Sequence, residues 1–123
     1  MNIEFTGDKM IYLQLADWIE DNIIAGVFGV GTQIPSAADM AATFRINHIT
    51  ALKGMNLLAE EGILTKRRGM GMYVTSEACM LILEKRKEQF HSEYIMPLIK
   101  EATKLGISQK ELQDMIATNM EEK

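Results

Sequence analysis

The residues most able to do chemistry lie in one short stretch, residues 65–74, with the sequence TKRRGMGMYV. Lys66, Arg67 and Arg68 precede a Gly-Met-Gly turn, and a β-prone pair follows it. Such a stretch suits either a loop that holds a phosphate or a hairpin that grips a nucleic-acid backbone. A nucleotide-binding loop has a strand before its glycines and a helix directly after them. Here the cations come first and a strand follows, which favours the hairpin.

The other groups that could serve catalysis or metal binding are isolated. The single cysteine, Cys79, excludes an internal disulfide and a Cys-rich zinc site, and it has no partner histidine in a recognisable arrangement. His91 has only Glu84 and Glu88 as helical neighbours, a pattern typical of surface pairing. The sequence offers no paired carboxylates and no cofactor loop. We therefore expect no enzyme, no cofactor and no metal site.

Positive charge is concentrated around the basic stretch, although the whole chain is acidic. The 123 residues carry a net charge of −4, which argues against a general coat for nucleic acid. Between Arg45 and Gly69, however, five cations stand against two acids, a local net charge of +3. We expect something anionic to be the partner of this window.

Length and composition indicate one domain, or one small domain with an appendage. Hydrophobic residues make up 47% and charged residues 24% of the chain, as in an ordinary soluble protein. No apolar run approaches the roughly 20 residues of a membrane span. The N-terminus lacks both a basic start and an apolar segment, so we expect no signal peptide and a cytoplasmic location.

The elements that position the basic stretch are mostly helices. Apolar residues at helical spacing predict a helix over residues 10–26, a short second helix capped by Ser36, and a third that runs from a cap at Asn47 to about Glu61. Gly54 within the third helix indicates that the first or second helix crosses there. The exposed face of the third helix is expected to carry a mixed polar and basic set: His48, Ile49, Leu52, Lys53 and Asn56.

The last third of the chain predicts one long helix and one short helix. The apolar spacing continues across Pro97, so we expect a helix, capped by Ser76, that is kinked or broken near Tyr94. Ser108 and Glu111 have the spacing of a capping box that starts a last helix. The apolar stripe of these helices is either internal core or a subunit interface. Two short helices can hardly bury it alone, which favours packing against a second copy of the chain.

Two helices joined by a short loop and followed by a basic hairpin make a winged helix-turn-helix, a mainly α fold with a small β wing. In such a fold the second helix can enter a major groove about 12 Å wide, while the wing holds the flanking backbone. A serine at the N-terminus of the first of these two helices can hold a phosphate together with free backbone N–H groups. The candidate contacts to double-stranded DNA are Ser36, Asn47, His48, Thr50, Lys53, Lys66, Arg67, Arg68 and Gly69.

Four phrases carry a resemblance to a known family: IYLQLADWIEDNIIAG, GTQIPSAADMA, INHITALKGMNLLAEEGIL and KRRGMGMYV. In this order and spacing, residues 11–75 resemble the DNA-binding domain of the GntR family of bacterial transcription regulators. The tail YIMPLIKEATKLGISQKELQDMI further resembles the two-helix C-terminal region of the YtrA subgroup. The resemblance implies a winged DNA-binding domain at residues 1–75 and a helical region at 76–123 that serves dimerisation and any effector.

The resemblance further implies a homodimer, paired through the C-terminal helices, that binds a palindromic operator and usually represses. The family commonly has arginine where this chain has Ala38 and His48. Because a bidentate arginine is the commonest specific contact to guanine, these departures suggest an altered operator preference, with more of the grip left to Lys53 and the wing. By position, the family's DNA contacts fall on Ser36, Asn47, His48, Thr50, Arg68 and Gly69.

Two other classes of function are alternatives. The winged helix could be a protein-interaction module without specific DNA binding; the local charge of +3 argues against it, and absence of DNA affinity at low salt would favour it. The chain could also be a small enzyme, but no set of residues suggests a reaction.

Overall fold

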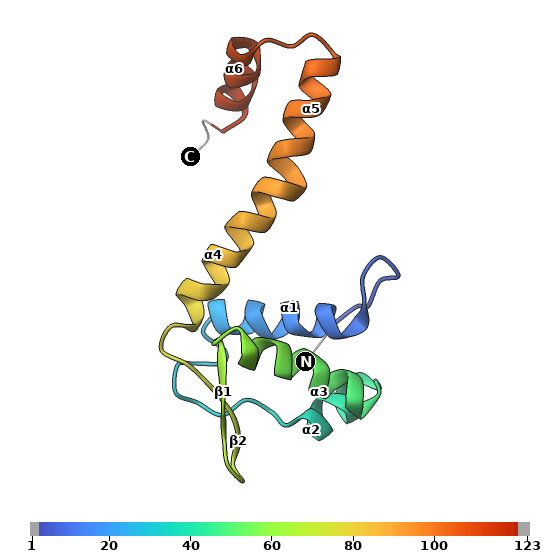
Figure 1. Cartoon of the computed structure of the whole chain (residues 1–123), viewed down its shortest axis with the longest axis vertical. Helices are drawn as coiled ribbons and strands as arrows, with labels where there is room; N and C mark the ends of the chain where they lie inside the picture. Colours follow the sequence, from blue (N-terminus) through green and yellow to red (C-terminus); the bar gives the residue numbers. More distant parts are fainter. Residues whose placement is uncertain (1–2, 121–123) are drawn as a thin grey trace. The chain divides into compact units, whose positions relative to one another are not determined.

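Three helices and a two-stranded sheet form the N-terminal part of the chain (Figure 1). They are α1 (Ile11–Ile24), α2 (Ala37–Phe44), α3 (His48–Glu60), β1 (Leu64–Arg67) and β2 (Gly71–Val74). Four helical segments follow: α4 (Ala78–Phe90), the π-helical turn η1 (His91–Ile95), α5 (Met96–Lys104) and α6 (Gln109–Met120). The computed structural model describes residues 3–120 and divides into two compact units, Met1–Glu84 and Lys85–Lys123. The predicted mainly α fold with a small β wing is confirmed.

The core of the first unit is built from one apolar stripe on each helix. The buried residues of α1, α2 and α3 recur at spacings of three and four, and include Leu15, Ile19, Ile23, Ala37, Met40, Ala51, Met55 and Leu58. Trp18 joins α1 to α2, with its ring centroid 5.0 Å from that of Phe44. Ala78 and Ile82, from the start of α4, belong to the same core.

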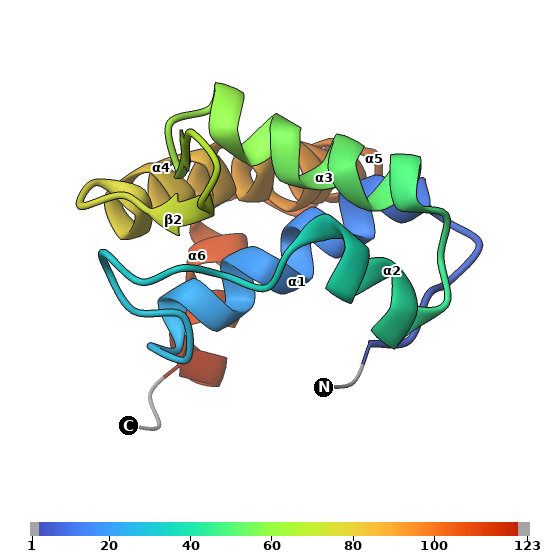
Figure 2. The same cartoon turned by 90° about the horizontal axis from the view of Figure 1, so that it is seen from below.

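α1 crosses α3 at Gly54, where a side chain would not fit. A Cβ atom built on Gly54 would lie 2.7 Å from the backbone carbonyl oxygen of Tyr12. Figure 2 shows the two helices side by side, as a close backbone approach requires. The predicted crossing is confirmed, and α1 is the helix that makes it.

The predicted starts of α2 and α3 are confirmed by their caps. The backbone N–H of Asp39 donates to Ser36 Oγ at 3.0 Å, and that of Ile49 donates to Asn47 Oδ1 at 2.7 Å. Arg45 lies between the two helices in the left-handed region, with φ of 56°. This single left-handed residue reverses the chain tightly enough to pack α2 against α3.

The hairpin that follows α3 is the wing, defined here as residues 64–74. β1 and β2 are antiparallel, with Leu64 opposite Val74 and Arg67 opposite Gly71. Gly69 at the tip has φ of +72° and Gly71 has φ of +92°, conformations that favour glycine. The loop before α2 adds a short third edge, because the Ile34 N–H donates to the Met72 carbonyl at 3.0 Å. The hairpin was predicted; this third edge was not.

One predicted cap was wrong. α4 begins at Ala78, and Ser76 lies in the turn before it. The Ser76 hydroxyl donates to the carboxylate of Glu77 at 2.9 Å, and the first hydrogen bond of the helix runs from the Leu81 N–H to the Glu77 carbonyl at 3.0 Å. The turn is instead closed by the Ala78 N–H, which donates to the Thr75 carbonyl at 3.2 Å.

The helical segments of the second unit contain the predicted irregularity. The π-helical turn η1 ends directly before α5, in which Pro97 is the second residue. Proline lacks the N–H that would bond to the Glu93 carbonyl, and a π-helical turn is one way for a helix to absorb that loss. Before α6, the Ser108 N–H donates to Glu111 Oε1 at 2.9 Å and the Glu111 N–H donates to Ser108 Oγ at 3.1 Å. The predicted capping box is therefore confirmed.

The second unit has almost no core of its own. Among its described residues only Ala102 is buried. An open hollow of about 560 Å³ lies beside η1 and α5. The exposed large apolar side chains of this unit are Phe90, Tyr94, Met96, Leu98, Ile99, Leu105, Met115, Ile116 and Met120. No helix within residues 3–120 is long and apolar enough to cross a membrane.

Candidate nucleic-acid interface

The two cap residues hold their helices and still have hydrogen-bond donors for a ligand. Ser36 uses its oxygen as an acceptor, so its hydroxyl hydrogen can point to a phosphate oxygen. Asn47 likewise uses Oδ1, and its amide nitrogen keeps two N–H donors. Both residues are exposed at helix N-termini, where free backbone N–H groups and the helix dipole favour an anion. Each cap can therefore position a phosphate.

The first turn of α3 presents two further candidate residues. His48 is exposed and begins the helix, and no hydrogen bond of its side chain is found within residues 3–120. Thr50 is half-buried, so it offers less of its surface. Of these two side chains, His48 is the one that extends freely from the surface of the helix.

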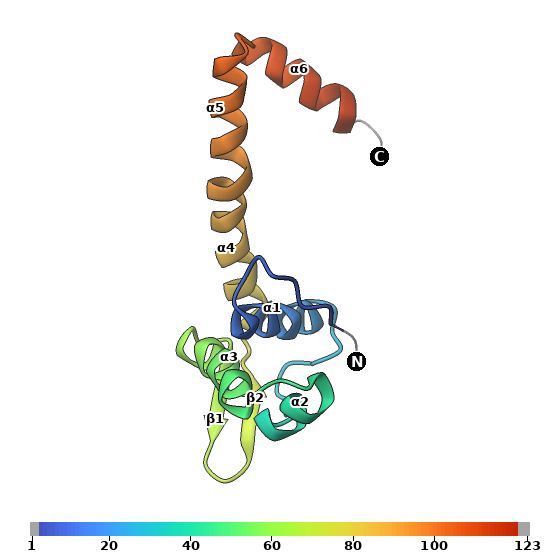
Figure 3. The same ribbon diagram turned by 90° about the vertical axis from the view of Figure 1, so that its right-hand side faces the viewer.

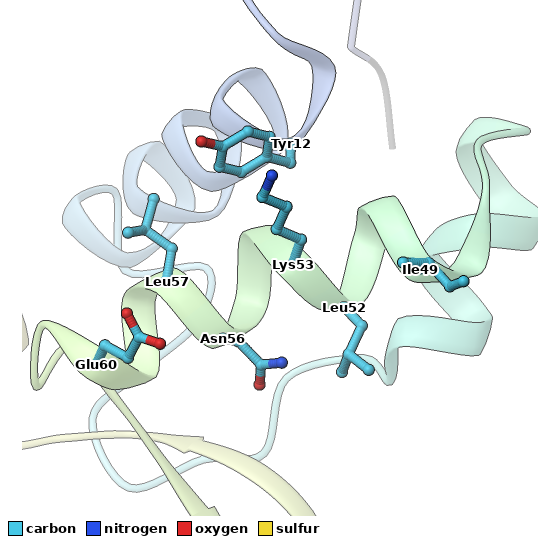
Figure 4. A pocket seen from close by; sticks show the side chains of 7 residues that line it. All are labelled: Tyr12, Ile49, Leu52, Lys53, Asn56, Leu57 and Glu60. Atoms are coloured by element: carbon cyan, nitrogen blue, oxygen red, sulfur yellow. The ribbon is translucent and has the colours of Figure 1, made fainter.

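Lys53 points toward α1. Its Nζ atom lies 4.2 Å from the centre of the Tyr12 ring, a cation–π contact (Figure 4). The side chains of Leu52 and Asn56 point away from Tyr12 in the same view. Lys53 thus borders an open groove of about 410 Å³ on the exposed face of α3, and its charge is held at the α1 side of that groove.

The wing places its cations on both faces of the ribbon. Lys66 is opposite Met72, whereas Arg67 is next along the strand and therefore points to the other face. The guanidinium carbon of Arg67 lies 4.0 Å from the centre of the Tyr73 ring, which fixes it on that face. Arg68 and Gly69 are exposed at the tip. A ribbon with this arrangement can meet phosphates on two sides.

Gln33 braces the wing tip from the loop before α2. Its Nε2 donates to the Met70 carbonyl, and the Tyr73 hydroxyl donates to its Oε1 at 3.5 Å. A Cβ atom on Gly71 would lie 2.7 Å from Gln33 Nε2, so this amide is packed directly against the hairpin. The brace limits the positions that the cations of the tip can take.

The helices and wing are arranged so that these groups share one side of the unit. Figures 1 and 3 show α1 on one side of α3, and α2 with the tip of the wing on the other. The N-terminus of α2, the N-terminal turn of α3 and the tip therefore border the surface away from α1. This is the arrangement of a winged helix-turn-helix.

The family model described as "Bacterial regulatory proteins, gntR family" matches residues 11–74, which include α1, α2, α3 and the wing. The chain belongs to the GntR family. As a GntR-family protein it is a DNA-binding transcriptional regulator and not an enzyme. The resemblance identified from the motifs is thereby confirmed at the level of the family.

Relatives of similar length support the family assignment over nearly the whole chain. The HTH-type transcriptional regulator YhcF of Bacillus subtilis is 28% identical over 118 residues, 96% of each chain. The crystal structure of a GntR-family regulator from Bacteroides thetaiotaomicron has 35% identity and a TM-score of 0.78, covering 89% of this chain and 96% of that one.

A third relative was solved together with DNA. BusR of S. agalactiae, in complex with its busAB-promoter DNA, is 26% identical with a TM-score of 0.61, covering 89% of this chain and 53% of BusR. Several longer curated relatives are matched over only 14% to 30% of their own length. What those longer proteins share with this chain is a segment of 66 to 71 residues.

Three side chains that support the interface in this GntR-family chain are not among the residues predicted from the sequence to contact DNA. Tyr12 holds Lys53, Tyr73 holds Arg67, and Gln33 holds the wing tip. All three contacts join different elements, and those of Tyr12 and Gln33 join residues about 40 positions apart. No periodicity or motif signals such pairs, because they depend on how the elements pack.

Proposed function

We propose that this GntR-family regulator is a homodimeric repressor of the YtrA subgroup that binds a palindromic operator. In this proposal residues 1–75 bind DNA and residues 76–123 pair the subunits. The observation that carries it is the combination of two helix N-termini with free donors and a wing with cations on both faces. BusR, a relative with the same winged fold, was solved bound to promoter DNA, which supports DNA as the ligand of this surface.

The proposed contacts divide into three kinds. Ser36, Asn47 and the backbone N–H groups beside them would position phosphates without reading sequence. His48 and Thr50 would lie in the major groove, where base edges differ between all four base pairs. Lys53 would contact DNA from the α1 side, where its ammonium lies beside Tyr12. Lys66, Arg67, Arg68 and Gly69 would follow the flanking backbone, and the two-faced ribbon would contact a phosphate on either side.

The proposed dimer rests on the exposed apolar surface of the second unit. With Ala102 as the one buried residue among its described positions, this unit leaves its apolar stripe to water. Exposed apolar surface of this extent is typical of an interface. A two-fold dimer through these helices would also present two winged domains to the two halves of a palindrome.

Selection of bound DNA from a random pool tests the proposal directly. The expected product is a two-fold sequence with half-sites about one helical turn apart, and sedimentation of the free protein should give twice the mass of the chain. Affinity for the selected DNA should fall steeply as salt rises, because phosphate contacts release counterions. A stable monomer, or binding that ignores sequence, would contradict the proposal.

His48 is expected to influence which operator is preferred rather than how tightly DNA in general is held. His48→Ala should change the base frequencies at one or two positions of the selected sequence and cost about 1–3 kcal/mol on the wild-type operator. Binding to unrelated DNA should stay the same within about twofold, since an exposed side chain is lost and no phosphate contact is removed. The check is a repeated selection with the variant, followed by titration of both operators. A uniform loss on all sequences would place His48 on the backbone instead.

A further inference from the structure

Two apolar side chains are exposed on the face of α3 that the proposed function turns toward DNA. Ile49 is 73% exposed and Leu52 is 36% exposed. They lie three positions apart, so they are neighbours on one side of the helix. Leu52 points away from Tyr12 and α1 (Figure 4). Neither belongs to the core cluster, and Ile49 is largely uncovered, whereas Leu52 keeps about a third of its surface exposed.

The surroundings of this apolar pair restrict the kind of partner. Both residues line the groove of about 410 Å³ whose α1 side carries the Lys53 ammonium, and which Glu60 also lines. Ile49 is also in the first turn of α3, where the helix dipole favours a negative partner. The surrounding window from Arg45 to Gly69 has a net charge of +3. The partner must therefore be anionic and must also offer small apolar groups close to its charges.

Duplex DNA meets both conditions in its major groove. Each thymine carries a 5-methyl group on the groove floor, and apolar side chains are the groups that distinguish it there. Neighbouring side chains on a helix are about 5–6 Å apart at Cβ, and neighbouring bases rise by about 3.4 Å. One helix turn can thus meet methyl groups on the same or the next base step.

We propose that Ile49 and Leu52 read thymine methyl groups in the operator, which makes them specificity-determining residues. This inference rests on the proposed DNA-binding function. Each half-site is therefore expected to contain thymines under the N-terminal turns of α3.

The experiment replaces each thymine of the selected operator, one at a time, with deoxyuridine, which removes only the methyl group. For wild-type protein, the affinity should fall about fourfold at each thymine that is contacted and stay unchanged at the others. In the Ile49→Ala variant, deoxyuridine at one of these sensitive positions should no longer reduce the affinity. In the Leu52→Ala variant, the same should hold for a neighbouring position. Combining each protein variant with each base replacement in a double-mutant cycle therefore assigns each methyl group to a side chain.

A matched control removes an exposed apolar side chain elsewhere. Val27 is 67% exposed in the loop after α1, and Val27→Ala should keep the wild-type response to every deoxyuridine. Because Ile49 and Leu52 are at the surface, their alanine variants should fold, which circular dichroism and the sedimentation coefficient will check. Binding to unrelated DNA at low salt should be equal in all four proteins, because no cation is changed.

The outcomes separate the inference from the function on which it rests. If wild-type protein selects no sequence, the proposed function fails. If it selects an operator but tolerates deoxyuridine everywhere, the function stands and the inference is overturned. If Ile49→Ala and deoxyuridine reduce affinity independently, another residue contacts the methyl group and the assignment is overturned. If both alanine variants bind the operator as well as wild type, the apolar pair does not contact the operator and the inference is overturned.

Discussion

Gly54→Val is expected to destabilise the N-terminal unit by about 3 kcal/mol or more, a large share of the roughly 5–15 kcal/mol that holds a small domain together. The Cβ atom alone would lie 2.7 Å from the Tyr12 carbonyl oxygen, and two methyl groups would follow it. The obstacle is the backbone of α1, which cannot rotate away as a side chain does. α1 would have to move off α3, and contacts of Leu15 and Ile19 with the core would be lost.

Urea unfolding followed by circular dichroism measures this effect as a lower midpoint at unchanged slope. Gly7→Val is the matched control: nothing lies within 4 Å of a Cβ at Gly7, so its midpoint should stay close to wild type. Equal midpoints for the two variants would mean that α1 and α3 are not in backbone contact at Gly54. DNA binding is expected to fail together with folding, since α3 is held in place by α1.

Removal of the three wing cations is expected to have the largest effect on DNA binding. In the triple variant Lys66→Ala/Arg67→Ala/Arg68→Ala, affinity for the operator at 0.1 M salt should fall roughly 500-fold per subunit. Each lost phosphate contact costs about eightfold, the factor by which one contact strengthens binding when salt falls from about 1 M to 0.1 M. The slope of log affinity against log salt should become shallower by about three for each subunit bound. The preferred sequence should stay the same, since backbone contacts carry no sequence information.

The control removes the same charge from the other unit. Lys100→Ala/Lys104→Ala/Lys110→Ala changes the net charge equally but lies in α5 and α6, outside the proposed DNA surface. Its salt slope should match wild type within experimental error. If both triple variants lost affinity to the same degree, general charge rather than contact by the wing would explain binding. Titrations at four or more salt concentrations distinguish the two explanations.

The parts of the fold that the sequence predicted correctly are those whose signal lies in a few neighbouring residues or in a single residue. The caps Ser36 and Asn47, the Ser108–Glu111 capping box and the turn at Gly69 follow from a few neighbouring residues. Gly54 signalled a close approach because glycine is unfavourable within a helix without such a reason. The cap at Ser76 was wrong because the helix starts one residue later, with its first hydrogen bond accepted by the Glu77 carbonyl.

The candidate interface was less predictable because it depends on the direction in which each side chain points as well as on the position of its residue in the sequence. The sequence groups Lys66 and Arg67 as one basic run, but the alternation of a strand sends them to opposite faces. Lys53 is on the predicted face of α3, yet its charge is drawn to the Tyr12 ring. Ile49 and Leu52 were predicted to be exposed, and only the groove around them and the helix terminus beside them suggest a purpose.

The two cap residues are constrained in evolution by folding, whereas the exposed residues that follow the second cap are free to change. Loss of the cap at Ser36 or Asn47 costs a helix about 1 kcal/mol, so the fold itself selects these side chains. His48 and Ile49 are the next residues after the Asn47 cap, and both are exposed. Substitutions there leave the folding free energy nearly untouched. A duplicated copy of such a regulator can therefore acquire a new operator by exchanges within one helical turn, while the caps keep the same scaffold foldable throughout its divergence.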